Sequence, residues 1–272
     1  HPLVARVAFT GGPETARHVV RNTAENFAVT TLELGGKSPV IVFDDANLDS
    51  ALNGVIAGIW GATGQSCVAG SRLLVHDSIH DEFVARLAKR AGEIKIGSPL
   101  DMATEMGPLA TLKQVQRAEK LIEASVAAGA VLVTGGKAKT GAGYYFEPTI
   151  LLAPTVELPC VREEFFGPVL SVLKFKTEAE AVALANGTNY AFAAGIFTQN
   201  LGRAHRLTKK IRAGVVWVNT YRAVSPIVPF GGNGYTGHGR ESGLDAIRDY
   251  TRTKSIWINT SDVPMADPFV MR

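Results

Sequence analysis

Cysteine is scarce in this chain of 272 residues: only Cys67 and Cys160 occur, far apart and outside any CxxC spacing. Two such cysteines cannot form a disulfide framework, and a reducing cytoplasm is the expected setting. An excess of one charge sign is also lacking, because 28 Lys and Arg stand against 25 Asp and Glu along the chain. Nucleic acid is therefore not an implied partner. No apolar run approaches the roughly 20 residues that cross a bilayer, so no membrane partner is expected.

Intrinsic disorder is excluded as well, since 46% of the residues are hydrophobic and 19% are charged. The length fits one large domain or two modest ones. The chain starts at His1, and no basic segment followed by an apolar one comes after it. We therefore expect that an N-terminal part was removed or that the chain is a piece of something longer.

Short β-branched runs alternate with longer stretches of helical period, which predicts an α/β fold with a mainly parallel sheet covered by helices. Strands are expected over residues 4–9, 29–34, 40–43, 72–75, 131–133, 145–151, 169–175, 194–197 and 215–218. Helices are expected over residues 79–94, 112–128, 178–185 and 201–211, with others starting at Pro13 and after Asp45 or Asn47. A last alternating stretch, 251–260, predicts one more strand, which belongs to a different sheet.

The loop around Cys67 contains the first candidate for catalysis. Residues 64–71 (GQSCVAGS) are rich in Gly and Ser and follow a helical segment. Such a loop lets backbone N–H groups approach a developing oxyanion closely. From the residues alone, Cys67 is either a nucleophile or a small core residue. Cys160, between Pro159 and Val161, is expected to serve packing.

Two acidic positions pose a similar choice. Glu33 stands in an apolar strand that ends at a Gly-Gly pair, where a catalytic group can project into a crevice. A buried carboxylate is costly unless it is paired or its pKa rises, so the alternative is an outward-facing residue on a half-buried strand. The doublet Glu163-Glu164 precedes the FFGP run at 165–168. It forms either a surface turn or a site where one carboxylate binds sugar hydroxyls beside an aromatic wall.

The histidines do not predict a metal site. His76 and His80 are four residues apart, but the intervening sequence does not match a zinc-protease pattern and crosses a strand-to-helix boundary. No Cys–His dyad can be named from the sequence order. The Gly11-Gly12 pair before a helix is a weak signal for an anion site.

Taken together, four segments resemble the motifs of the aldehyde dehydrogenase superfamily. LELGGKSP at 32–39 is similar to the family's glutamate motif, and GQSC at 64–67 to its cysteine motif, at the family's separation. EEFFGPV at 163–169 is similar to the cofactor-contacting motif, and PFGG at 229–232 with GRE at 239–241 to the C-terminal signature. The four motifs follow one another in the family's order over nearly the whole chain.

This resemblance implies the oxidation of a small-molecule aldehyde to a carboxylic acid with NAD, NADP not being excluded. Cys67 would be the nucleophile that forms a thiohemiacetal and then a thioester, with its own backbone N–H as an oxyanion donor. Glu33 would activate the hydrolytic water, and its presence favours hydrolysis over acyl transfer to coenzyme A. The implied cofactor-binding positions are Gly11, Gly12, Leu34, Gln114, Arg117, Glu164 and Phe166.

The aldehyde itself is implied to lie among four positions of mixed aromatic and aliphatic character, Ser66, Val68, Tyr221 and Phe230. That mixture suggests a moderately apolar aldehyde. Arg222 could meet a charged substrate only if it faces inward.

The resemblance also implies how the chain is divided. The family's oxyanion asparagine and the lysine and acid that contact the adenosine ribose lie upstream of His1, so we expect the N-terminal half of a full-length member to be missing. The turn at 9–16 (FTGGPETA) has Gly12 where members usually carry Ser or Thr, and Ala16 where they carry Gly. The expected parts are the tail of the dinucleotide-binding domain (1–36), the catalytic domain (37–235), a return to the first domain (236–250), and an oligomerisation strand with a tail (251–272). That strand is expected to join a homodimer or homotetramer.

Two other functions stay open from the sequence. An isolated, non-catalytic domain could serve as an interaction or structural module, which the missing half favours and the intact pair of Cys67 and Glu33 opposes. A cysteine-dependent ester or thioester hydrolase would use the same two residues without a dinucleotide.

Overall fold

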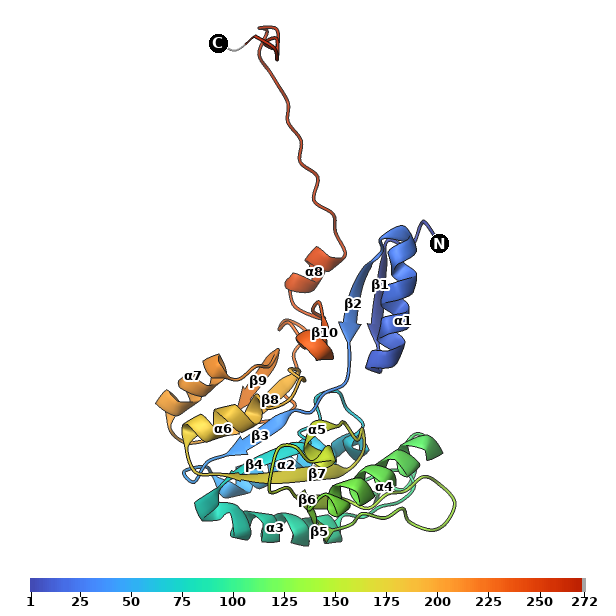
Figure 1. Ribbon diagram of the computed structural model, residues 1–272, viewed down its shortest axis with the longest axis vertical. Helices are drawn as coiled ribbons and strands as arrows, with labels where there is room; N and C mark the ends of the chain where they lie inside the picture. The colour runs from blue at the N-terminus through green and yellow to red at the C-terminus, as the bar shows by residue number, and fades with distance from the viewer. Residues whose placement is uncertain (271–272) are drawn as a thin grey trace.

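Two β-sheets organise the chain, and the computed structural model describes residues 1–270 (Figure 1). The larger sheet has seven strands in the order β5-β6-β7-β4-β3-β8-β9, and all neighbouring pairs are parallel except β5 with β6. Its strands are β3 (Pro39–Val42), β4 (Arg72–His76), β5 (Val131–Thr134), β6 (Thr149–Leu152), β7 (Val169–Phe175), β8 (Ala193–Phe197) and β9 (Val215–Val218). The predicted α/β fold with a mainly parallel sheet is confirmed.

Helices cover both faces of this sheet. On one face lie α2 (Leu48–Ile59) and α3 (His80–Glu93); on the other lie α4 (Leu112–Ala127), α5 (Pro159–Arg162), α6 (Glu178–Ala185) and α7 (Leu201–Lys210). In β3, Val40 and Val42 pack toward the first set of helices, whereas Ile41 packs toward the second. A strand covered on both faces has no polar side, which explains why the sequence of β3 is a continuous apolar run. Cys160 is fully buried in the second of these cores, as predicted.

A smaller sheet stands beside the larger one (Figure 1). Its strands β1 (Arg6–Thr10) and β2 (Val29–Glu33) are parallel and joined by α1 (Pro13–Thr23), and β10 (Gly237–His238) pairs with β2 in the antiparallel sense. Pro13 occupies the first turn of α1, where its missing N–H leaves no helical bond unmade. Only residues 34–38 separate the end of β2 from the start of β3. The carboxyl end of the small sheet therefore meets the amino end of the large one.

Most of the predicted elements are present within a few residues of their expected bounds, including α6, whose bounds match. The strand expected over 145–151 instead begins at Thr149. Residues before Pro148 pair with a neighbouring turn, through bonds such as that from the Glu147 N–H to the Lys137 carbonyl at 3.0 Å. Pro148 lacks an N–H for the ladder, and register with β7 starts at the next residue. The helix after β3 is capped by Asn47, whose Oδ1 accepts from the Ser50 N–H at 2.9 Å.

The strand expected over 251–260 is not formed within the chain. These residues follow the short helix α8 (Asp245–Asp249), are extended and exposed, and run away from both sheets (Figure 1). A strand needs hydrogen-bonding partners along its edge, and no strand of residues 1–270 lies beside this segment. None of the described helices is long and apolar enough to cross a membrane.

Candidate active site

The loop that carries Cys67 is held in a strained conformation at the end of α2. Ala62, Thr63 and Gly64 all adopt positive φ, with values of 52°, 56° and 69°. At Gly64 a Cβ would lie 2.1 Å from the Gly167 carbonyl oxygen, so only glycine fits there. Strain of this kind persists where the surrounding structure fixes the backbone, and it is common at functional sites.

Hydrogen bonds to other segments fix the rest of this loop. Gln65 Oε1 accepts from the Ala110 N–H at 2.9 Å, and the Tyr221 hydroxyl donates to the Val68 carbonyl at 2.8 Å. Burial raises the pKa of the Tyr221 hydroxyl, which keeps it a donor. Cys67 is half-buried at the end of these contacts.

The Cys67 thiol is not acidic on its own. Burial raises its pKa, the nearby Glu33 carboxylate raises it further, and the backbone N–H of Val68 opposes both effects. A thiolate therefore needs either a proton acceptor or a positive charge beside it.

Glu33 ends β2 and is buried, with 5% of its surface exposed. Neither carboxylate oxygen has a hydrogen-bond partner within residues 1–270. Burial and the Glu241 charge raise the pKa of Glu33 to about 7, against the opposing effect of Arg240. The alternative of an outward-facing residue on a half-buried strand is thus excluded, and the side chain has the properties of a general base near neutral pH.

Glu164 lies against the Gly-Gly pair that follows β2. Its Oε1 accepts from the Gly36 N–H at 2.8 Å, and a Cβ at Gly35 would lie 2.0 Å from Oε2. Burial raises the pKa of Glu164, while the Gly36 N–H and the charges of Lys37 and Arg117 oppose the rise. Glu163, in contrast, fits the alternative of a surface turn, because its carboxylate forms an exposed ion pair with Arg117, with Oε2 3.3 Å from Nη2.

One cleft of about 530 Å³ brings these groups together. The predicted positions that line it are Gly11, Gly12, Glu33, Leu34, Ser66, Cys67, Glu164 and Phe166. The predicted positions outside its lining are Val68, Gln114, Arg117, Tyr221 and Phe230. Eight of the thirteen predicted site positions thus line a single cavity.

The predicted positions outside the lining have other contacts. Arg117 donates to the Glu164 carbonyl at 3.2 Å and so supports the backbone of that residue. Gln114 lies in the first turn of α4, where its N–H donates to the Thr111 hydroxyl. Phe230 packs against Phe192, with ring centroids 5.3 Å apart. The roles implied for these residues stay predictions.

Arg240 and Glu241, whose charges act on Glu33, had no predicted role. Phe230 and Glu241 exchange two backbone hydrogen bonds, each 2.7 Å long, which hold the 239–241 segment near the carboxylate of Glu33. Arg240 donates to the carbonyls of Gly232 and Gly239 at 2.8 and 2.7 Å. In the sequence, only the GRE motif at 239–241 marked these residues. That motif lies about 200 residues downstream of Glu33 and does not predict that the two are close in space.

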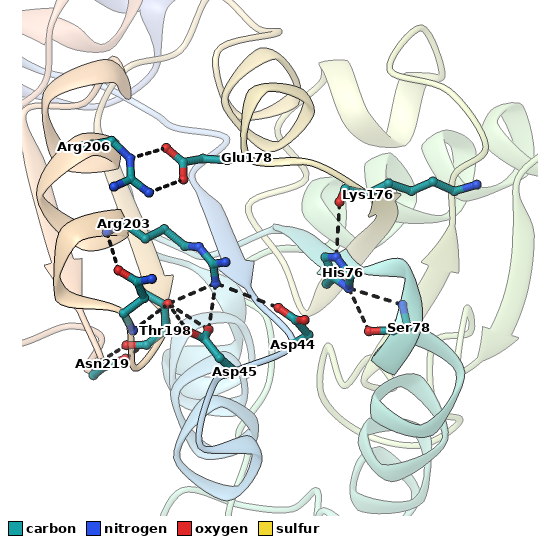
Figure 2. Close-up of polar contacts among 11 residues, drawn as sticks. Asp44, Asp45, His76, Ser78, Lys176, Glu178, Thr198, Arg203, Arg206 and Asn219 are labelled. Atoms are coloured by element: carbon teal, nitrogen blue, oxygen red, sulfur yellow. Dashed lines mark hydrogen bonds and ion pairs between the residues drawn. The ribbon is translucent and has the colours of Figure 1, made fainter.

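The two histidines that are four residues apart do not converge. His76 contacts the Ser78 hydroxyl and the Lys176 carbonyl (Figure 2), whereas His80 contacts Asp81. In the described part of the chain no three His, Cys, Asp or Glu side chains come close enough to hold a metal ion.

Known proteins share this arrangement. The sequence profile of the aldehyde dehydrogenase family matches residues 1–256. The (Z)-2-((N-methylformamido)methylene)-5-hydroxybutyrolactone dehydrogenase of Acinetobacter baylyi is 60% identical over the whole chain, which spans 56% of that protein. The betaine aldehyde dehydrogenase of Brucella anthropi is 42% identical over 97% of the chain and 55% of its own length.

Solved structures agree with the sequence comparisons. Betaine aldehyde dehydrogenase of Staphylococcus aureus, in complex with NAD+, superposes on the whole chain with a TM-score of 0.95 at 38% identity, covering 55% of its own chain. PnpE in complex with nicotinamide adenine dinucleotide gives a TM-score of 0.94 at 42% identity, over 99% of this chain and 56% of its own. The chain thus spans about half the length of the relatives it matches. On the family match and these identities, the chain belongs to the aldehyde dehydrogenase family.

Proposed function

We propose that this chain carries the nucleophile, the base and part of the dinucleotide site of an NAD(P)+-dependent aldehyde dehydrogenase. One observation carries the proposal: Cys67, Glu33 and Glu164 line the same cleft, although they come from three separate segments of the sequence. A thiol, a carboxylate with a pKa of about 7 and a second buried carboxylate are the groups that acyl formation, hydrolysis and ribose binding need.

Two groups in the lining of the cleft suit parts of a dinucleotide. Gly11 and Gly12 precede the first turn of α1, whose N-terminus has no side-chain cap, so its N–H groups can face a phosphate. Glu164 packs against Gly35, where any side chain would collide with its carboxylate. The glycine therefore leaves a carboxylate free to accept bonds from ribose hydroxyls. When bound there, NAD(P)+ would supply the acceptor for the hydride of the aldehyde.

The chain's own residues account for the remaining steps. The Cys67 thiol would lose its proton to solvent, its sulfur would attack the carbonyl carbon of the aldehyde, and the backbone N–H of Cys67 would stabilise the resulting alkoxide. Glu33 would later remove a proton from a water molecule as that water attacks the thioester, which releases the carboxylic acid and the thiol. A pKa near 7 lets Glu33 accept that proton and return it to solvent at neutral pH.

The test of the nucleophile is acylation with an activated ester such as 4-nitrophenyl acetate, followed by peptide mass mapping. We expect an acetyl group on Cys67 and none on Cys160, because Cys160 is fully buried. The Cys67→Ser variant should lose the adduct, and the Cys160→Ser variant should keep it. Equal labelling of both cysteines, or no adduct, would contradict the assignment.

Two further assays separate this proposal from the alternatives. With an aldehyde and NAD(P)+, the protein at its full natural length should form NAD(P)H and lose that activity on Cys67→Ser substitution. Sustained ester hydrolysis without any NAD(P)H formation would favour a cysteine-dependent hydrolase. Absence of both activities in the wild type would favour a non-catalytic role, and retention of both in Cys67→Ser would contradict Cys67 as the nucleophile. The 272-residue chain alone is expected to bind NAD+ weakly, which calorimetry checks.

We also infer the substrate class and the assembly. A 5-hydroxybutyrolactone, the kind of compound in the name of the Acinetobacter relative, is the ring-closed form of an aldehyde that carries a carboxylate. We therefore propose small aldehydes of this type as substrates. The exposed side chains of Ile256, Trp257 and Ile258 support pairing of 251–260 with another copy in a homodimer or homotetramer. Light scattering before and after removal of that segment tests the assembly.

A further inference from the structure

Arg222 lies against the helix that leads into the cysteine loop. It follows Tyr221, which holds the Val68 carbonyl, and its own Nη1 donates to the Ala57 carbonyl at 3.2 Å in the last turn of α2. Neither Ala57 nor Arg222 lines the dinucleotide cleft. The guanidinium therefore approaches the cysteine loop from a side that the dinucleotide would not occupy.

Most N–H groups of this guanidinium have no partner among residues 1–270 and are open to solvent. Arg222 is partly buried, yet it forms no ion pair with an acidic side chain of residues 1–270. Its one hydrogen bond goes to a neutral carbonyl, whereas a guanidinium has five N–H donors. A Cβ at Gly61 would lie 2.8 Å from Nη1, so the absence of a side chain there makes room for the charge.

The backbone at this position is also unusual. Arg222 has a φ of 62°, in the left-handed region that costs a residue with a side chain free energy. Apolar side chains follow it on the surface, since Val224, Ile227 and Val228 are 66%, 82% and 55% exposed. Arg222 thus lies between the end of α2, which leads into the cysteine loop, and an exposed apolar segment of the chain.

We propose that Arg222 binds the carboxylate of the substrate, which makes aldehydes with a distal carboxylate the preferred substrate class. The inference rests on the proposed function, in which the dinucleotide occupies the cleft, and it adds that the aldehyde approaches Cys67 from the side on which Arg222 lies. A planar guanidinium matches a carboxylate with two parallel hydrogen bonds, and partial burial strengthens such a pair. The apolar side chains beyond it would contact the carbon chain of the substrate.

The test compares two substrates that differ only in the distal group: 4-oxobutanoate, which has the carboxylate, and butanal, which lacks it. The protein is assayed with NAD(P)+ at its full natural length, as wild type and as Arg222→Ala and Arg222→Lys. Arg206→Ala serves as the control, because it removes an equal charge from an exposed ion pair with Glu178 (Figure 2), and α7, which carries Arg206, covers the other face of the sheet from α2.

We expect Arg222→Ala to lower kcat/KM for 4-oxobutanoate by about 10- to 100-fold, mainly through KM, as expected for loss of a charged hydrogen bond. The value for butanal should stay within about twofold, Arg222→Lys should fall between, and Arg206→Ala should change neither. Added salt should weaken wild-type use of 4-oxobutanoate more than use of butanal, and Arg222→Ala should abolish that difference.

Three outcomes are decisive. An unchanged ratio of the two kcat/KM values in Arg222→Ala would overturn the inference and leave the proposed function intact. Failure of the wild type to oxidise either substrate would overturn the proposed function itself. If Arg222→Ala does not fold, the Arg222→Lys variant decides, because loss of the bidentate fork alone should reduce the preference for the carboxylate.

Discussion

Replacing Glu33 by glutamine should stabilise the protein in a pH-dependent way. The folded chain raises the pKa of Glu33 from 4.5 to about 7 through burial and the Glu241 charge. Between those values the folded state holds a proton that the unfolded state has released, so the free energy of unfolding falls as the pH rises through this range. At about 1.4 kcal/mol for each pH unit, the ionised carboxylate costs at most about 3 kcal/mol above pH 7.

Glutamine has nearly the same shape and carries no charge at any pH. We therefore expect Glu33→Gln to raise the free energy of unfolding by up to about 3 kcal/mol at about pH 8, and by little at about pH 5, where Glu33 is already protonated. Urea titrations at both pH values measure the difference. Glu123→Gln, on the exposed face of α4, is the control and should give no pH-dependent change. A gain that is equal at both pH values, or a loss at about pH 8, would refute the assignment of a buried, partnerless carboxylate.

Three other substitutions test the frame around the site. Lys37 is fully buried, with its Nζ 4.7 Å from the centre of the Phe165 ring, and burial lowers its pKa from 10.5 to about 7. Lys37→Met should therefore raise the free energy of unfolding more at about pH 6, where the buried amine is charged, than at about pH 10. Urea titrations at both pH values measure this. Arg72 is buried and donates to three main-chain carbonyls. Because Arg72→Met leaves those carbonyls without a partner, it should lower the free energy of unfolding by about 3–5 kcal/mol. A loss under about 1 kcal/mol would contradict this. Gly64→Ala should displace the cysteine loop and slow acylation of Cys67 at least about tenfold, measured by the release of 4-nitrophenol under conditions where the protein remains folded.

Local sequence predicted the parts of the site that are local. Glu33 stands at the end of an apolar strand that a Gly-Gly pair terminates, and Cys67 stands in a Gly-rich loop. In both cases the residues that set the backbone conformation lie within a few positions of the functional side chain. The placement of Glu241 beside Glu33 depends on a return of the chain to β2 through β10, which no local pattern encodes. The same holds for Arg222, whose contact with Ala57 joins positions 165 residues apart. The segment 251–260 alternates like a strand but has no edge to pair with within residues 1–270, so its pairing with another copy stays a prediction.

The carboxyl edge of the large sheet helps to explain why the cleft lies elsewhere. In open α/β sheets, ligands usually bind at the carboxyl ends of strands where the connections diverge, which here is between β3 and β8. Figure 2 shows this point filled by side chains. The Thr198 hydroxyl bonds to both Asp45 oxygens at 2.8 and 2.9 Å, and Arg203 Nη1 donates to Asp45 at 2.9 Å. The Asn219 amide exchanges two hydrogen bonds with the Thr198 backbone.

With that crevice occupied, the cleft forms where the carboxyl end of β2 faces the amino ends of β3 and β4. The proposed base then comes from the small sheet and the proposed nucleophile from the loop before β4, so their separation depends on the short link at 34–38. At Gly36 a Cβ would lie 2.3 Å from the Cys67 carbonyl oxygen, which means that this link and the cysteine loop touch backbone to backbone. A side chain there would have to move the two sheets apart, and Glu33 would no longer be aligned with Cys67. The hydrogen bond from the Gly36 N–H to Glu164 Oε1 would also be lost. The Gly-Gly pair is therefore what couples the three chemical groups of the site, although neither glycine takes part in the chemistry.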